Sequence, residues 1–261
     1  MAKHRRVWNQ ATYEKYVRDG RGCGSGADYT PWIRVQDFAS RGVVSRVKGR
    51  TTGRVHHLLS NNELAYFYML DWSDNVIDIR EQFPLSDLEC AVAVAAQAGI
   101  RYPTDNKSGY PYVMTCDFMI TTMSGVKART IKMASELENT RTIEKLEIER
   151  RYWAKQGVDW RIVTENEISR QKAKNIEWLY TAERFTIAGH NEHELERIRC
   201  ALLNLLNLGD NSVIETARTV ENDFLLPAGA GLQLFKQLVL EKKLAIDLSI
   251  PLNMNAKAVA A

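Results

Sequence analysis

Two neighbouring apolar runs, separated by a turn that contains glycine, form the clearest pattern in the chain. Residues 112–122 are rich in β-branched and aromatic side chains, and residues 127–133 repeat this composition in a shorter, more charged form. Met123, Ser124 and Gly125 lie between the runs, and glycine suits a tight reversal because it readily adopts positive φ. The pattern predicts a β-hairpin.

Helical and strand patterns alternate around this hairpin in the first part of the chain. The helical patterns cover residues 9–19, 60–72, 86–98 and 140–155. Strand-like patterns cover residues 30–38, 43–49, 76–84 and 158–164, with a basic turn at residues 50–54. In the last of the helices, one amphipathic stripe is formed by Ile143, Leu146, Arg150 and Trp153. The order helix, strand, hairpin, helix and strand predicts an α/β core.

The second predicted helix begins with a capping box, in which Ser60 is followed three residues later by Glu63. Leu64, Phe67 and Leu70 supply the apolar face of this helix. Glu63 therefore has a structural explanation as the partner of the cap. A carboxylate in the first helical turn is also suited to share a metal site, and the pattern alone does not separate the two interpretations.

The pattern changes to helices after residue 165. Helices are expected over residues 168–179, 192–208, 212–220 and 231–242, with a final strand over residues 243–250. Helices joined to one short β element suggest a winged-helix-like module, which would bind either DNA or a protein. We therefore expect one domain over residues 1–165 and a mainly helical interaction domain over residues 166–261.

Composition fits a globular protein of a reducing compartment. The chain has 261 residues, of which 45% are apolar and 26% charged. No run of about 18 apolar residues occurs, and no apolar stretch follows the charged N-terminus, so neither a membrane span nor a secretory signal is expected. The four cysteines form no Cys-x-x-Cys pair, which argues against a zinc site or a disulfide framework and fits the cytoplasm. For the adjacent His56 and His57, a loop or helix-entry role is favoured over metal ligation.

Positive charge is concentrated at the N-terminus. Residues 1–58 contain twelve basic and four acidic residues, although the formal net charge of the whole chain is only +3. These basic residues alternate with the aromatic residues Trp8, Tyr13, Tyr16, Tyr29 and Trp32. Such interleaving is typical of surfaces that follow a phosphate backbone, but a solvated N-terminal face explains the charge equally well. The candidates for DNA contact are Arg5, Arg6, Lys48, Arg50 and Arg54.

The predicted hairpin places Asp117 in its first strand and Thr130 and Lys132 in its second. Because side chains repeat every two residues along a strand, Thr130 and Lys132 face the same side of the sheet, and Asp117 joins them if the register allows. An ion pair at a sheet edge is one explanation of the Asp and the Lys. The other is the arrangement of metal-dependent nucleases, in which the Asp holds Mg²⁺ and the Lys stabilises the attacking hydroxide.

Several longer blocks of sequence resemble one protein family. One block is Asp-Ile-Arg-Glu-Gln-Phe-Pro-Leu at residues 78–85, and the others lie at 20–22, 28–32, 52–60, 63–65, 115–118, 144–153 and 175–180. On these blocks the chain is similar to the TnsA family, the endonuclease subunits of heteromeric bacterial transposases. The remaining C-terminal residues resemble that family only in length and helical character.

The resemblance implies a restriction-endonuclease-like mixed sheet flanked by helices, followed by the helical, winged-helix-like domain. The family's catalytic glutamate, metal-binding aspartate and lysine fall on Glu63, Asp117 and Lys132. The two carboxylates would hold two Mg²⁺ ions about 4 Å apart, with Mn²⁺ as a substitute. Lys132 would stabilise the charge that builds at the attacked phosphorus.

The residue two places before the lysine departs from the family. Relatives usually have Gln there, and related nucleases have Glu, whereas this chain has Thr130. A hydroxyl reaches less far than an amide oxygen, so Thr130 would be a poorer metal ligand, and water or the Ile131 carbonyl would complete the shell. We expect the presence of Thr130 in place of Gln to lower the affinity for the metal more than it changes the cleavage chemistry.

The resemblance also implies a function and a set of partners. In the family, the nuclease cuts near the 5′ ends of a transposon while a DDE-type transposase cuts and joins the 3′ ends, which frees the element for cut-and-paste transposition. The implied partners are transposon-end DNA, that transposase and an AAA+ ATPase regulator, which would contact the C-terminal domain. Two alternatives stay open: a catalytically weak or inactive assembly factor that bridges the transposase and the ATPase, and a stand-alone nuclease of the same fold.

Overall fold

A computed structural model describes residues 7–37 and 43–257 of the chain. It contains two compact units, Met1–Ile168 and Ser169–Ala261.

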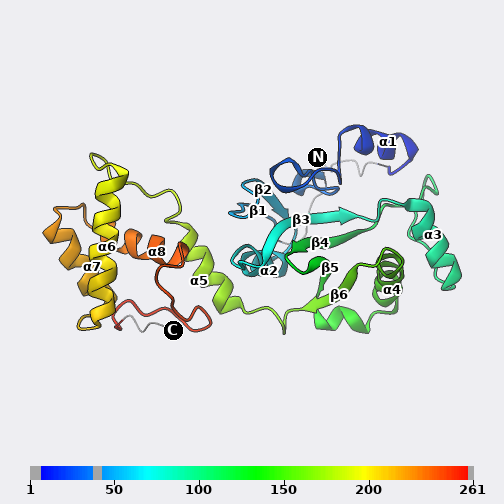
Figure 1. Ribbon diagram of the computed structural model, residues 1–261. Coiled ribbons are helices and arrows are strands. Elements are labelled where there is room, and N and C mark those ends of the chain that lie inside the picture. Colours follow the sequence, from blue (N-terminus) through cyan, green and yellow to red (C-terminus); the bar gives the residue numbers. More distant parts are fainter. Residues whose placement is uncertain (1–6, 38–42, 258–261) are drawn as a thin grey trace, which may run out of the picture. The chain divides into compact units, whose positions relative to one another are not determined.

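The first unit is built on a four-stranded mixed sheet (Figure 1). Its strands, in spatial order, are β3 (Val76–Pro84), β4 (Thr115–Thr122), β5 (Gly125–Lys132) and β6 (Asp159–Thr164). The β3–β4 and β4–β5 pairs are antiparallel, and the β5–β6 pair is parallel. The predicted hairpin is confirmed, because Thr122 pairs with Gly125 across a turn of Met123 and Ser124.

Helices pack on this sheet as the α/β pattern predicts. They are α2 (Asn61–Asp71), α3 (Leu88–Gln97) and α4 (Thr140–Lys155). Helix α1 (Gln10–Arg18) packs Tyr13 and Tyr16 against Trp32, and short 3₁₀ turns lie at Gly26–Asp28, Val35–Asp37 and Ala134–Glu138. Between the sheet and helices α3 and α4 lies a buried cluster of Leu85, Ala91, Ala95, Tyr102, Cys116, Met119, Ala128, Ile148, Tyr152 and Trp153. Removing this apolar surface from water stabilises the unit and fixes β4 and β5 in place.

The expected stripe on α4 is wrong in part. Leu146 and Trp153 are buried, but Ile143 and Arg150 are exposed. The buried polar residue of this helix is Glu149, which lies one turn from Leu146 and faces β5. Glu149 and Arg150 both fall at helical spacing between Leu146 and Trp153, so the periodicity alone did not show which of the two faces inward.

A separate two-stranded sheet lies beside β3, formed by β1 (Ser45–Lys48) and β2 (Val55–Leu58) (Figure 1). The turn between these strands is the predicted basic turn. The strand predicted over residues 30–38 is wrong for residues 30–37, which contain no strand and hold the 3₁₀ turn Val35–Asp37, whereas residue 38 lies outside the described residues. The loop or helix-entry role expected for His56 and His57 is also wrong, because both residues lie in β2.

The second unit is helical. Its helices are α5 (Arg170–Tyr180), α6 (Glu192–Leu208), α7 (Val213–Asp223) and α8 (Ala230–Leu240). The final strand predicted over residues 243–250 is wrong: the segment forms turns, and the only β pairing described in this unit is the isolated bridge between Ser212 and Lys257. None of the helices within residues 7–37 and 43–257 has the length and apolar character needed to cross a membrane.

Candidate active site

Asp117 and Lys132 meet where strands β4 and β5 separate. The last residue pair of the β4–β5 ladder at this end is Phe118 with Arg129. Beyond it, Oδ2 of Asp117 accepts a hydrogen bond from the backbone N–H of Ile131 at 2.6 Å, and Nζ of Lys132 lies 3.8 Å from the same oxygen. The carboxylate therefore takes the place of a strand partner and lies next to the ammonium group.

Glu63 approaches from the N-terminus of α2. The Ser60 hydroxyl caps this helix by accepting a hydrogen bond from the backbone N–H of Glu63 at 3.1 Å. The carboxylate of Glu63 accepts from the Ser60 hydroxyl at 2.9 Å and from the backbone N–H of Leu59 at 3.0 Å. This differs from the expected capping box, in which the glutamate bonds to the N–H of the cap residue itself. The cap thus holds Glu63 with its side chain buried.

Gln82 on β3 joins the two carboxylates. Its Nε2 lies 3.1 Å from Oδ1 of Asp117 and 3.4 Å from Oε2 of Glu63. Three predicted site residues from separate elements, Glu63, Asp117 and Lys132, are therefore linked through short contacts. The structure brings them together as the sequence pattern and the resemblance predict.

Electrostatics in this cluster favour added positive charge. Burial, followed by repulsion from Asp117, raises the pKa of Glu63 to about 8. Burial alone would lower the pKa of Lys132, but the attraction of Asp117, with Glu149 and other carboxylates, outweighs it and leaves this pKa raised. Lys132 stays protonated at neutral pH. With both carboxylates ionised, the one ammonium group would leave a buried net negative charge, which a divalent cation would compensate.

Thr130 is turned toward α4. Its hydroxyl donates to Oε2 of Glu149 at 2.6 Å and accepts from Nε1 of Trp160 at 3.2 Å, and the residue is only 1% exposed. Burial raises the pKa of Glu149 to about 7, with repulsion from Asp117 acting in the same direction. The Thr130 hydroxyl thus holds a buried carboxyl group, and its role as a metal ligand stays a prediction.

The donors in the cluster fit a hard divalent cation. Carboxylate oxygens of Glu63 and Asp117 and the backbone carbonyl of Ile131 are the oxygen ligands that Mg²⁺ prefers. That carbonyl accepts a hydrogen bond from Nζ of Lys132 at 2.9 Å, which places it beside the same cluster. No group of three or more His, Cys, Asp or Glu side chains suited to a metal occurs among the described residues. A cation here would therefore rely on two carboxylates, this carbonyl, water and a phosphate oxygen, as is usual for Mg²⁺.

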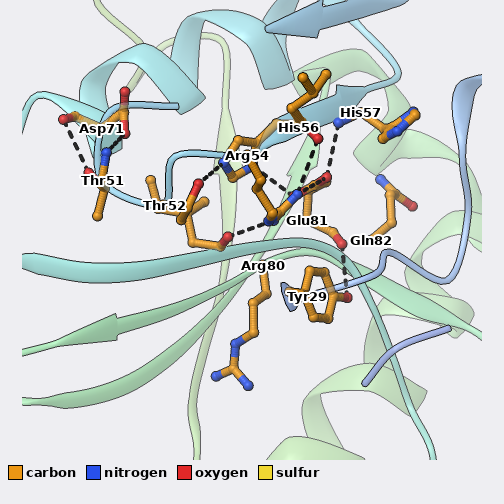
Figure 2. Close-up of polar contacts among 12 residues, drawn as sticks. Tyr29, Thr51, Thr52, Arg54, His56, His57, Asp71, Arg80, Glu81 and Gln82 are labelled. Atoms are coloured by element: carbon orange, nitrogen blue, oxygen red, sulfur yellow. Dashed lines mark hydrogen bonds and ion pairs between the residues drawn. The ribbon is translucent and has the colours of Figure 1, made fainter. Parts of the chain in front are cut away.

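The candidates for DNA contact differ in their exposure to solvent. Lys48 is exposed on β1, and Arg50 follows in the turn, where its backbone N–H and that of Thr51 both donate to the Asp71 carboxylate at 2.9 Å. This clasp fixes the basic turn on α2. Arg54, in contrast, directs its guanidinium inward onto Glu81 (Figure 2). Arg5 and Arg6 lie outside the described residues.

Glu81, which precedes Gln82 on β3, is the centre of a buried polar network (Figure 2). It accepts hydrogen bonds from Arg54, from Nδ1 of His56 at 2.8 Å and from the backbone N–H of His57 at 2.9 Å. These partners lower the pKa of Glu81 to about 2 although burial opposes the shift. The Thr52 hydroxyl contacts Nε2 of His56 at 2.7 Å, so Thr52, His56 and Glu81 have the connectivity of a hydrolytic triad. Each of the three is buried, and the network fastens the β1–β2 hairpin to β3.

The N-terminal aromatic residues pack against one another. Trp8 and Trp32 are buried together, with ring centroids 6.3 Å apart, and Tyr16 lies 5.4 Å from Trp32. Tyr29 is buried against Phe83. The interleaving of aromatic and basic residues thus has a structural explanation, because these rings form a core and are not arrayed for base stacking.

Two residues of the cluster, Gln82 and Glu149, were absent from the sequence-based site. Gln82 lies inside the block at residues 78–85 on which the family resemblance rests, which was a signal for it. Glu149 lies at helical spacing from Leu146 and Trp153, so a carboxylate on the inward stripe was the available signal. In both cases the chemistry depends on a contact between segments far apart in sequence.

Comparisons with known proteins match nearly the whole chain. A family model described as "TnsA-like endonuclease N terminal" matches residues 73–165, and one described as "TnsA endonuclease C terminal" matches residues 167–248. The chain is 36% identical over 241 residues to "Transposon Tn7 transposition protein TnsA" of Escherichia coli. That alignment covers 91% of this chain and 86% of the relative.

Proposed function

This chain belongs to the TnsA family of transposition endonucleases, and on that premise we propose that it is a Mg²⁺-dependent enzyme that cuts the 5′ strands at transposon ends. The observation that carries the proposal is the convergence of Glu63, Asp117 and Lys132, joined by Gln82. Such a group of two desolvated carboxylates and a lysine has little value for packing alone, because burying charge is unfavourable.

The side chains have separate roles in phosphodiester hydrolysis. Glu63 and Asp117, with the Ile131 carbonyl, would hold one or two divalent cations against the scissile phosphate. Bound Mg²⁺ supplies Lewis acidity toward a phosphate oxygen and lowers the pKa of a water molecule. Lys132 keeps its proton and stabilises the negative charge that develops on the phosphate oxygens in the transition state. The backbone N–H of Ile131 orients the Asp117 carboxylate by donating a hydrogen bond to Oδ2.

The basic β1–β2 hairpin supplies the surface for the DNA backbone in this proposal. Arg46 and Lys48 are the exposed residues of β1, and Arg50 follows in the turn clasped by Asp71. Phosphate contacts of this kind position a duplex without reading its sequence. The choice of cleavage site would therefore come from a partner, which in this proposal is a DDE-type transposase bound to the same DNA end. An AAA+ regulator bound by the second unit completes the proposed assembly.

The test is a strand-resolved cleavage assay on transposon-end DNA, with the cognate transposase and either Mg²⁺ or Mn²⁺. We expect 5′-strand cuts that require this protein, the transposase and the metal. If the 3′ strands are cut and the 5′ strands stay intact with both metals, the protein is an assembly factor and not a nuclease. Site-specific cuts without the transposase would instead identify a stand-alone nuclease.

A further inference from the structure

Gln82 has a defined amide orientation between the two acidic residues. The Asp117 carboxylate accepts hydrogen bonds and does not donate them, so the amide nitrogen must face it, at 3.1 Å from Oδ1, and the same nitrogen lies 3.4 Å from Oε2 of Glu63. The amide oxygen then faces Thr115, whose hydroxyl donates to it at 3.0 Å. Both ends of the amide group are therefore used, and the residue is only 2% exposed.

The backbone at Gln82 is held in an unfavourable conformation. Its φ of 48° lies in the left-handed region, which non-glycine residues seldom adopt. Its backbone carbonyl accepts a hydrogen bond from the N–H of Trp32 at 3.3 Å, and the carbonyl of Glu81 accepts one from the Tyr29 hydroxyl at 3.1 Å (Figure 2). Such conformations persist where the surroundings fix them, and they are concentrated at functional sites.

From these contacts we propose that Gln82 is a positioning residue, which sets the separation and orientation of the Glu63 and Asp117 carboxylates for a divalent cation. The inference rests on the proposed cation site. One nitrogen that bonds to both groups keeps an oxygen of each within reach of the same point. A carboxylate oxygen that accepts one hydrogen bond retains a lone pair for a cation, so the bridge and the cation are compatible.

Gln82 acts through the carboxylates and not as a ligand itself. Its oxygen, the atom that binds cations, is held by Thr115 on the side away from Asp117 and Glu63. Thr115 is thus the second member of the device, because its hydroxyl prevents the amide from rotating. Hydrogen-bond partners of ligating groups typically change metal affinity about 10- to 100-fold when they are removed.

The direct test is calorimetric titration of the full-length protein with MnCl₂. Gln82→Met keeps the length of the side chain and removes both polar atoms, and we expect about 10- to 100-fold weaker Mn²⁺ binding. Cleavage by this variant should require correspondingly more Mn²⁺ and approach the wild-type rate at saturation. Gln237→Met is the matched control, because Gln237 donates to the carbonyls of Ala182 and Phe185 in the second unit. It removes an amide with two hydrogen bonds and should leave Mn²⁺ affinity unchanged.

Thr115 provides a second pair of variants that leaves Gln82 in place. Thr115→Val removes the hydroxyl and keeps the shape, and we expect Mn²⁺ binding several-fold weaker than in the wild type. Thr115→Ser keeps the hydroxyl and should bind Mn²⁺ normally. This pair tests the inference even if Gln82→Met does not fold.

The outcomes separate this inference from the proposed function. If Gln82→Met and Thr115→Val bind Mn²⁺ as tightly as the wild type while Asp117→Asn does not bind it, Gln82 has no positioning role and the cation site stands. If the wild type does not bind Mn²⁺, both proposals fail. Weaker binding in Gln82→Met and Thr115→Val, with normal binding in Thr115→Ser and Gln237→Met, supports the inference.

Discussion

The ammonium nitrogen of Lys132 lies 3.8 Å from Oδ2 of Asp117, at the point where β5 leaves its ladder with β4. The two residues are brought together by the hairpin, whereas Glu63 comes from a helix outside the sheet. The site therefore depends on how α2 docks against β3. The charges in and around the site predict changes in stability, which are measured without DNA, and in DNA binding and cleavage.

Glu63 should make the cation-free protein less stable as pH rises. Its pKa is about 8 in the folded protein against an ordinary value of 4.5, so the folded state binds the proton more tightly than the unfolded state. Stability is then greatest below the ordinary value and falls as pH rises toward 8. In EDTA, Glu63→Gln should unfold with a flatter pH dependence than the wild type. A wild type and variant with parallel pH profiles from pH 5 to 8.5 would show that Glu63 ionises normally.

Glu81→Gln should be strongly destabilising although Glu81 is outside the proposed chemistry. The substitution leaves the buried guanidinium of Arg54 without its carboxylate partner, and breaking a buried pair in this way costs about 3–5 kcal/mol. Urea unfolding measures the change in the free energy of unfolding. Glu144→Gln, which removes the partner of Arg141 from a half-exposed pair on α4, should change it by less than about 1 kcal/mol. Equal effects of the two substitutions would contradict the fastening role of Glu81.

Thr130→Gln, which restores the residue usual in the family, should lower stability. Thr130 is almost fully buried against Glu149 and Trp160, and a longer side chain in a packed site typically costs about 1–3 kcal/mol. Thermal unfolding measures the effect, and Thr130→Ser is the control because it keeps the hydroxyl. If Thr130→Gln is as stable as the wild type and binds Mn²⁺ more tightly, the site accommodates the family's ligand and our description of Thr130 is wrong.

Lys48→Ala should weaken DNA binding without any dependence on sequence. One lost phosphate contact lowers the slope of log affinity against log salt by about 0.9. The measurement is fluorescence anisotropy with a labelled duplex at several salt concentrations. Lys145→Ala, which removes an exposed lysine on α4, should leave the slope unchanged. An unchanged slope in Lys48→Ala would remove the β1–β2 hairpin from the proposed DNA surface.

The sequence predicted elements whose pattern is local. The β4–β5 hairpin and helices α1 to α8 follow from periodicity, caps and glycine turns, which act within a few residues. It failed for β2, because the polar pair His56 and His57 becomes a strand only through Glu81 on β3. It also failed at residues 243–250, where an apolar alternation finds no neighbouring strand among the described residues.

The site residues also differ in how far away in the sequence their partners lie, and this decides which of them could be predicted. Asp117 and Lys132 were predicted together because the turn that joins their strands is short. The pattern identified Glu63 as a cap residue, and only the family resemblance joined it to Asp117 and Lys132. Its contact with Gln82 shows how the structure connects it to Asp117. The roles of Gln82, Glu149 and Arg54 depend on partners many residues away, so no local pattern could assign them.

Glu63, Asp117 and Lys132 form one cation-dependent catalytic site in the proposed function. The most direct measurement is the single-turnover rate of 5′-strand cleavage in Mg²⁺, with the transposase present, for Asp117→Asn, Lys132→Met and the double variant. Residues that act as one unit have strongly non-additive effects. We therefore expect each single variant to lose nearly all cleavage, and the double variant to be no slower, with melting temperatures close to that of the wild type. Wild-type cleavage rates in the single variants, or independent multiplicative losses in the double variant, would show that Asp117 and Lys132 do not act in one catalytic site.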